Sequence, residues 1–304
     1  MNRCMRCPSR GVTGGWNATF MPIRLALSVH FIARENVFDI SLCRIARDEQ
    51  RGLDAVRQLS SEGLSLKFHQ LDIVSSESID KIKTFLVEQY GGLDLLVNNA
   101  GIAFKRASTA PFAEQAEVTV HTNFHGTLNM CKAMLPILKP HARLVNISTH
   151  LGGLSQLSEE LQKKFSSPTL SEESLVNLMN QFVQDVKEGI HSKKGWSNTA
   201  YGISHVGIIA LTKILARAIT EDPRDDILIN ACDPGWVRTD MAGPKATKSP
   251  DEGAETPVYA ALLPTNAGQP NGEFLKDKII QEWEVMSCQS HAVAAENKTL
   301  NKQI

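Results

Sequence analysis

Three residues at the start of one apolar segment carry side chains suited to proton transfer. Tyr201 is followed by Ser204 and His205 within the segment 195–216. Positions four apart share a helix face, so a helix here would direct the Tyr201 phenol and the His205 imidazole into one site. A phenol beside a permanent cation gives or takes a proton near neutral pH. Because histidine is mostly neutral at pH 7, we expect the pKa of Tyr201 to stay near the ordinary value of about 10.

Further polar and small residues follow short apolar runs that are typical of buried strands. These are Asp72 and Ile73 after 67–71, Asn99 and Gly101 after 93–97, Thr149 at the end of 143–149, and Val237, Arg238 and Thr239 beyond 227–231. Small residues and amides at the carboxyl end of a strand suit a site where a ligand passes close to the backbone. Taken alone, the residues after the run 93–97 also fit a simple turn.

The elements that would position these residues alternate along the chain. The patterns predict helices over 21–34, 52–62, 76–89 and 111–136, and strands over 38–43, 67–71, 93–97, 143–149 and 227–231. Apolar strands that alternate with periodic helices predict a Rossmann-like, doubly wound parallel sheet of the α/β class. With no repeat and no linker-like break, we expect a single domain over 1–283 and a disordered tail over 284–304.

Two features interrupt this regular alternation. Asn123 stands in the middle of the predicted helix 111–136, where an amide is mildly unfavourable and calls for a polar bridge or a bound water. The segment 158–194 separates Thr149 from Tyr201 and has a helical pattern with one apolar face. An insertion of this length beside the candidate site predicts a helical arm that acts as a lid or shapes the substrate pocket.

Composition limits the classes of function. The chain has 304 residues, a net charge near −1 and 42% hydrophobic residues, which fits a globular protein and gives no argument for binding nucleic acid or a membrane surface. The sequence contains no run of 18 apolar residues, so we expect no membrane span. Cys4 and Cys7 form one CxxC pair without a second pair or a nearby histidine, so we expect no metal site.

The pattern of the six cysteines indicates reduced thiols and a cytoplasmic location. The first 34 residues carry five arginines and no acidic residue, a composition also typical of a mitochondrial transit peptide. Mitochondrial targeting is therefore the alternative for localisation.

From Arg47 to Trp283 the sequence resembles the short-chain dehydrogenase/reductases, and in particular the monomeric, NADPH-dependent carbonyl reductases. The resemblance is carried by the motifs LDI at 71–73, LDLLVNNAG at 93–101, TNF at 122–124, Tyr201, and PGWVRTDM at 234–241. The run AGPKATKSP at 242–250 and the long insertion are specific to that subfamily.

The resemblance implies a reaction and a role for each matching residue. Tyr201 would protonate the carbonyl oxygen as hydride arrives from NADPH, Thr149 would supply the hydroxyl of the catalytic serine, Asn123 would hold a water, and His205 stands where the family has lysine. Contacts to NADPH are implied for Gly14, Arg47, Asp72, Ile73, Asn99, Gly101, Val237, Arg238 and Thr239, with Arg47 on the 2′-phosphate. Substrate contacts are implied for Phe104, Lys105, Gln115, Ala200 and Trp236, of which the first three match positions that bind glutathione-type ligands. Arg47 also fits a solvated charge at a helix start, and Trp236 also fits core packing.

Three departures from the family pattern raise the question of how active the chain is. Thr149 replaces serine and His205 replaces lysine. The glycine turn TGxxxGxG keeps Gly14 but has Ala18 and Phe20 at its other two glycine positions, where side chains would meet the cofactor phosphates. Residues 1–43 are therefore atypical of the family.

Three hypotheses follow. The chain is a carbonyl reductase for ketones, aldehydes or quinones, with reduced activity; or it is a catalytically impaired relative that binds a ligand or partner; or its altered amino-terminal segment prevents stable folding.

Overall fold

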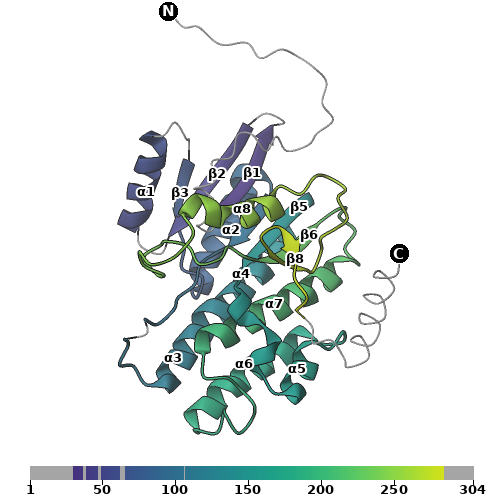
Figure 1. The fold of residues 1–304 in the computed structure, drawn as a ribbon. Helices are drawn as coiled ribbons and strands as arrows, with labels where there is room; N and C mark the ends of the chain where they lie inside the picture. The colour runs from purple at the N-terminus through teal and green to yellow at the C-terminus, as the bar shows by residue number, and fades with distance from the viewer. Residues whose placement is uncertain (1–29, 37–38, 47–48, 62–65, 106, 284–304) are drawn as a thin grey trace, which may run out of the picture.

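The computed structural model describes residues 30–36, 39–46, 49–61, 66–105 and 107–283, and these form an α/β fold around one sheet (Figure 1). The strands are β1 (His30–Asn36), β2 (Asp39–Ala46), β3 (Leu66–Gln70), β4 (Leu93–Asn98), β5 (Leu138–Ile147), β6 (Leu228–Asp233), β7 (Phe274–Lys276) and β8 (Ile279–Ile280). The α-helices are α1 (Glu49–Ser61), α2 (Ser76–Tyr90), α3 (Phe112–Thr119), α4 (Gly126–Met134), α5 (Glu159–Phe165), α6 (Glu172–Lys187), α7 (Ala200–Ile219) and α8 (Pro250–Ala261). Short helical segments are η3 (Val120–His125), η4 (Leu135–Ile137), η5 (His150–Gly152) and η6 (Leu154–Gln156).

The strands lie in the order β3-β2-β1-β4-β5-β6-β7-β8. The pairs β2–β3, β4–β5, β5–β6 and β6–β7 are parallel, so the Rossmann-like α/β class is confirmed. Strand β8 runs antiparallel to β7 at the edge of the sheet. Strand β1 lies in the interior and runs antiparallel to both of its neighbours, which the sequence did not predict.

The helix predicted over residues 21–34 is wrong for residues 30–34, which belong to β1. His30 pairs with Val97 and Ile32 pairs with Leu95, so the backbone of β1 satisfies the edge of the apolar strand β4. A helix in this place would leave the polar backbone groups on that edge of β4 unpaired. The predicted glycine turn around Gly14 lies outside the described residues, as do Arg47 and the tail 284–304.

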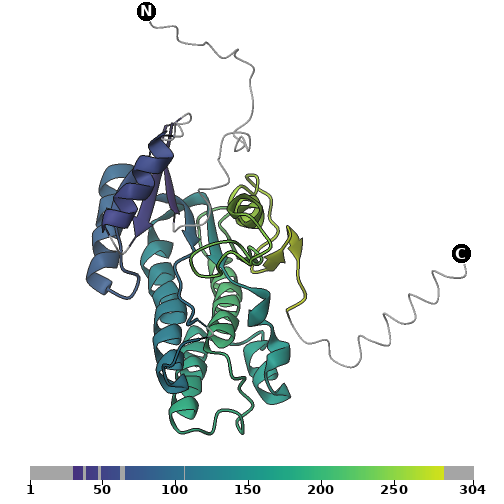
Figure 2. The same ribbon diagram turned by 60° about the vertical axis from the view of Figure 1, so that its left-hand side comes forward.

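Helices pack on both faces of the sheet (Figure 2). Helices α2, α4 and α7 pack on one face, where Leu96 and Leu144 belong to the larger apolar cluster. Helix α8 packs on the opposite face, where Leu95 and Val145 belong to a smaller cluster. Neighbouring residues of one strand thus enter different clusters, as the alternation of side chains along a strand requires.

The long helix predicted over 111–136 is present but its middle is not a regular α-helix. Helix α3 continues into the π-helical segment η3, which continues into α4. A π-helical turn inside a longer helix is rare and is often found at functional sites. Asn123, the amide that was unfavourable in a regular helix, lies in this turn.

The insertion 158–194 forms α5 and α6. The apolar face predicted for it is confirmed, since Leu175, Met179 and Phe182 are fully buried. Helix α6 packs against α3 and α7, and the Trp196 indole Nε1 donates a hydrogen bond of 2.8 Å to Asp185. The helical arm is therefore part of the packed core, a placement that differs from a lid over an open site.

Helix α7 is long and apolar enough, by length and composition, to cross a membrane, but 78% of its most apolar window is buried inside the protein. This degree of burial is that of a core helix. No other helix within the described residues passes that test.

Candidate functional site

The site is organised around the first turns of α7. Thr199 caps this helix, and its hydroxyl accepts a hydrogen bond of 3.0 Å from the Gly202 backbone N–H. The cap fixes where the helix begins and so directs Tyr201 and His205 to one side. Their rings meet edge to face with centroids 4.4 Å apart, which confirms the predicted juxtaposition. Ala200, at the first helical position, is buried beside them.

The electrostatics of this pair differ from the expectation of an ordinary phenol. Burial, together with the negative charge of Asp233, raises the pKa of Tyr201 to about 12. Burial lowers the pKa of His205 to about 4, so its imidazole is neutral at pH 7 and offers no positive charge to the phenol. The expectation that Tyr201 stays near 10 is therefore wrong, because it neglected desolvation of the phenolate. Tyr201 is a protonated phenol throughout the physiological range.

Two neighbouring hydroxyls at the end of β5 have different surroundings. The Thr149 hydroxyl accepts a hydrogen bond of 3.3 Å from the Leu151 backbone N–H and caps η5. The Ser148 hydroxyl is buried and lies 3.3 Å from His205 Nδ1. The sequence analysis assigned the catalytic hydroxyl to Thr149 and placed Ser148 on the opposite face of the strand. In the structure it is Ser148 that contacts His205. Strand alternation predicted that the two would diverge, but it did not show which one faces α7.

Asn123 provides the polar bridge that its position required. Its Oδ1 accepts a hydrogen bond of 2.8 Å from the Ile102 N–H, and its Nδ2 donates to the Ile102 carbonyl and to the Ser204 hydroxyl at 3.0 and 3.1 Å. A Cβ added at Gly101 would lie only 3.3 Å from Asn123 Oδ1, so the bare backbone of Gly101 allows this close approach. Asn123 thus joins the loop after β4 to the first turn of α7.

Asp233 at the end of β6 is a site residue that sequence reasoning missed. Its carboxylate is buried, and its Oδ2 lies 2.7 Å from His150 Nδ1. The same oxygen accepts the His150 backbone N–H at 3.0 Å, and Oδ1 accepts the Gly235 N–H at 2.7 Å. A signal was present, because Asp233 follows the apolar run 227–231 after a single cysteine and a carboxylate at a strand's carboxyl end is unusual. The partner His150 gave no such signal.

The residues expected to hold NADPH are only partly brought together. Asp72 follows β3, where its backbone N–H donates to the Ser78 hydroxyl at 3.0 Å and its Oδ1 accepts the Val74 N–H at 3.2 Å. Ile73 is buried against α4, since a Cβ at Gly126 would lie 2.7 Å from Ile73 Cδ1. Asn99 is half-buried beyond β4.

The loop after β6 carries the other expected cofactor contacts. Val237 is buried, while the exposed Thr239 uses its hydroxyl to accept the Ala242 N–H at 3.4 Å. The Arg238 guanidinium donates to the carbonyls of Ala246 and Thr247 at 3.2 and 3.0 Å. The Arg238 side chain therefore orders this loop, and its backbone N–H also bonds within the loop, donating to the Lys248 carbonyl at 2.9 Å.

Asp72, Asn99 and Val237 follow β3, β4 and β6, at the carboxyl edge of the sheet where dinucleotides bind in folds of this class. A Cβ at Gly101 would lie 3.3 Å from Asn123 Oδ1, and a Cβ at Gly235 would lie 2.9 Å from Lys248 Cδ, so neighbouring side chains lie close to the main chain at both glycines. Gly235 also has a φ of 82°, which other residues rarely adopt. The turn expected to bind the phosphates contains Gly14 and lies outside the described residues, as does Arg47. Within the described part of the chain, no group of three or more His, Cys, Asp or Glu side chains could hold a metal ion.

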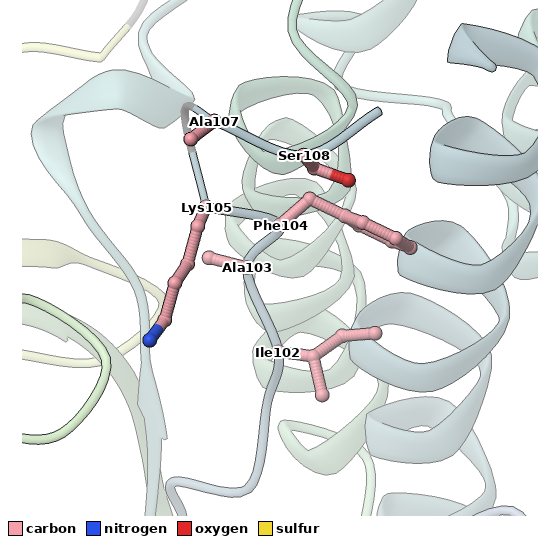
Figure 3. Close-up of a pocket in the computed structure, with 6 residues that line it drawn as sticks. All are labelled: Ile102, Ala103, Phe104, Lys105, Ala107 and Ser108. Atoms are coloured by element: carbon pink, nitrogen blue, oxygen red, sulfur yellow. The ribbon is translucent and has the colours of Figure 1, made fainter. Parts of the chain in front are cut away.

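The residues expected to touch substrate lie on separate elements, with Phe104 and Lys105 on the loop after β4, Gln115 on α3, Ala200 on α7 and Trp236 on the loop after β6. Phe104 and Lys105 line a cavity of about 500 Å³, with Ile102 and Phe104 on one side and Lys105 extending to the other (Figure 3). Gln115 lies outside its lining and donates a hydrogen bond of 2.8 Å to the Ala110 carbonyl. The Trp236 side chain is 51% exposed, which excludes core packing as its role.

Known proteins resemble this chain in sequence. The family described as short chain dehydrogenase matches residues 32–159. The chain is 55% identical over 258 residues to carbonyl reductase [NADPH] 1 of Rattus norvegicus, covering 84% of this chain and 92% of the relative. It is 54% identical to the protein of the same name from Homo sapiens, covering 80% and 91%.

Solved structures show the same fold. Salutaridine reductase from Papaver somniferum superposes with a TM-score of 0.68 at 27% identity, covering 77% of this chain and 90% of that one. Menthone neomenthol reductase from Mentha piperita gives 0.64 at 26% identity, covering 77% and 89%.

Proposed function

The chain belongs to the short-chain dehydrogenase family, and from this premise we propose that it reduces ketones, aldehydes or quinones with NADPH, with Tyr201 as the proton donor. The observation that carries the proposal is the placement of a protonated phenol at the carboxyl edge of the sheet. Relatives that are 55% and 57% identical to this chain over 258 and 241 residues are named as NADPH-dependent carbonyl reductases. A relative that binds ligands without turnover is the less favoured alternative.

When bound, NADPH supplies the hydride that reduces the carbonyl carbon. Tyr201 then gives its proton to the carbonyl oxygen, so that the phenol O–H bond breaks and the alcohol O–H bond forms. The alkoxide that develops from a ketone or aldehyde is a stronger base than a tyrosinate, so for these substrates the transfer is downhill even with a pKa of about 12 for Tyr201. The reverse reaction needs the tyrosinate, which is scarce at physiological pH. The site therefore favours reduction over alcohol oxidation.

Two measurements on the purified chain test this function. NADPH titrated against the protein should quench its tryptophan fluorescence, and menadione should drive NADPH oxidation measured at 340 nm. Tyr201→Phe should retain the quenching and lose turnover by about 10²–10⁴-fold. Quenching without any turnover in the wild-type chain would favour the ligand-binding alternative, and the loss of both signals would remove the reductase.

We further propose that the substrates include glutathione conjugates. The cavity beside Phe104 supports this, since the Lys105 ammonium at its wall suits a carboxylate of such a ligand. Lys105→Met should raise KM for a glutathione adduct and leave KM for menadione unchanged. Equal KM changes for both substrates would argue against this part of the proposal.

We also propose a cytoplasmic monomer. Buried Cys131 and Cys232 carry free thiols, which suits a reducing compartment. Light scattering of the purified chain would measure the mass, for which the sequence gives 33.4 kDa per copy. A fluorescent fusion to the carboxyl terminus would show the compartment, and mitochondrial signal would support the targeting alternative instead.

A further inference from the structure

Two histidines on the outer face of η3 take no part in the proposed reduction. His121 is exposed and His125 is half-buried, whereas Asn123 between them is buried and bonds to the first turn of α7. Residues four apart in a helix are neighbours on one face. The two imidazoles accordingly form a ring contact, with centroids 6.4 Å apart. Among the ring contacts of the described residues, this is the one that joins two histidines.

The hydrogen bonding of His125 leaves one of its ring nitrogens available to a ligand. Its Nε2 lies 3.0 Å from Oδ1 of Asn180 on α6, and an amide oxygen only accepts hydrogen bonds, so Nε2 carries the proton. In a neutral imidazole the lone pair is then on Nδ1. No described residue makes a hydrogen bond to this nitrogen, and it is not fully enclosed by the protein. The ring nitrogens of His121 likewise make no hydrogen bond with the described residues.

His125 is in the form that a metal ion requires. Burial lowers the pKa of His125, the hydrogen bond with Asn180 raises it by a smaller amount, and the nearby His121 lowers it again. At pH 7 the imidazole is therefore neutral and can offer its lone pair. A metal-binding histidine usually donates its other N–H to an oxygen that holds the ring in position, and Asn180 provides such an oxygen.

The spacing of the two rings suits one ion bound by both. Two histidines four positions apart on one helix face bind zinc in other proteins. Zn–N bonds of about 2.0–2.1 Å place two imidazoles of one zinc ion with their centroids roughly 5 Å apart. The observed separation of 6.4 Å is wider, but His121 is exposed, so a change of its χ angles can bring its ring to that distance.

We propose that His121 and His125 bind a divalent transition-metal ion such as zinc, through Nδ1 of His125 and one ring nitrogen of His121. Water fills the remaining positions, because no third His, Cys, Asp or Glu among the described residues is placed to join them. Two protein ligands make a weaker site than the four of a structural zinc site, so the ion should exchange with the medium. The ion would fasten the outer face of η3, whose inner face carries Asn123. The expectation of no metal site rested on Cys4 and Cys7 and took no account of this pair.

Calorimetric titration of zinc into the full purified chain, with its thiols reduced, tests the site near neutral pH. His121→Gln and His125→Gln should each raise the Kd of one zinc site about tenfold or more, because the loss of an outer-shell partner alone costs about 10–100-fold. His69→Gln is the matched control, since His69 of β3 contacts Phe85 and no other histidine, and it should leave that Kd unchanged. Asn180→Asp should lower the Kd, because a carboxylate is the stronger acceptor for the His125 N–H.

The variants also show which residues hold the ion. In the chain labelled with ¹³C-histidine, zinc should shift the NMR signals of His121 and His125 together, and each signal is assigned by its loss in the corresponding variant. His121 is exposed, so His121→Gln should keep the wild-type melting temperature, and this variant decides the question if His125→Gln does not fold. No zinc binding, equal affinity in the wild type and His121→Gln, or a shift of neither signal would overturn the proposal.

None of these measurements depends on turnover, so the site and the proposed function are tested separately. A chain that binds zinc through both histidines and does not reduce menadione would support the site and reject the reductase. A chain that reduces menadione and binds zinc equally well without His121 would support the reductase and reject the site.

Discussion

Replacing His205 by lysine tests whether the missing cation controls the chemistry of Tyr201. His205 is buried with its ring 4.4 Å from that of Tyr201, and its pKa of about 4 keeps it neutral. The substitution His205→Lys would place a charge where the wild-type chain has none. The nearby carboxylate of Asp233 offsets part of the desolvation of the introduced ammonium.

The expected effect follows from the distance and the burial of the pair. Two unit charges about 5 Å apart at an effective dielectric constant of about 20 interact by about 3 kcal/mol. That energy equals roughly 2.4 pKa units, which lowers the Tyr201 value from about 12 to roughly 9.6. At pH 9 the ionised fraction of the phenol then rises from about 0.1% to about 20%.

The assay measures both directions of the reaction as a function of pH. Alcohol oxidation with NADP⁺ needs the tyrosinate, so its rate at pH 9 should rise by about 200-fold in His205→Lys. Menadione reduction needs the phenol, so it should stay within about tenfold of wild type at pH 7 and should fall above about pH 9.6 in the variant alone. The glycine turn lacks glycine at positions 18 and 20, so we expect cofactor binding to keep both rates below those of the named relatives.

His205→Gln is the matched control, because glutamine is polar and carries no charge. It should leave both pH profiles close to those of the wild-type chain. If His205→Lys gave no gain in oxidation at pH 9 and no fall in reduction up to pH 10.5, the electrostatic argument for Tyr201 would be refuted. If His205→Lys reduced menadione at the rates of the named relatives, the expectation that the altered residues 1–43 weaken cofactor binding would be wrong.

Two further predictions concern stability. Asn123→Ala should lower the free energy of unfolding by about 1–3 kcal/mol, because it leaves the backbone groups of Ile102 without their partner. Asn180→Ala, at an exposed position of α6, is the control for urea unfolding. Acid should destabilise the chain through His205, because burial lowers the pKa of this residue to about 4 in the folded protein. The contribution of His205 to the free energy of unfolding, about 3 kcal/mol, is complete above about pH 6.5 and is lost as the pH falls towards 4. His205→Gln should flatten that part of the stability profile in urea titrations between pH 4 and 7, and an unchanged slope would mean that other groups cause it.

Much of the fold was predictable because its signals are local. The apolar runs 67–71, 93–97 and 227–231 correspond to β3, β4 and β6, and the periodic segment 76–89 corresponds to α2. Strand and helix periods record which face of an element is buried, and each can be read within about ten residues. The π-helical turn at Asn123 was not predicted, because a change in backbone hydrogen bonding does not alter the pattern of apolar residues. The presence of an asparagine that is unfavourable in a regular helix was the only signal at this position.

The direction of β1 could not be predicted in the same way. Residues 30–34 fit a helical pattern, yet they form a strand, because their backbone groups pair with the N–H and C=O groups on one edge of β4. Strand pairing joins segments that are more than sixty residues apart, so its outcome depends on what lies beside the chain after folding.

By itself the sequence determined the type of fold, the family and the four-residue spacing that brings Tyr201 and His205 together. Only the tertiary structure decided how strongly that tyrosine holds its proton and which residues surround it. Desolvation and the charge of Asp233 set the pKa of Tyr201, and both depend on contacts across the fold. The pairing of Asp233 with His150 joins the ends of two neighbouring strands, 83 residues apart. A pKa is a property of an environment, and that environment exists only once the sheet has brought distant residues together.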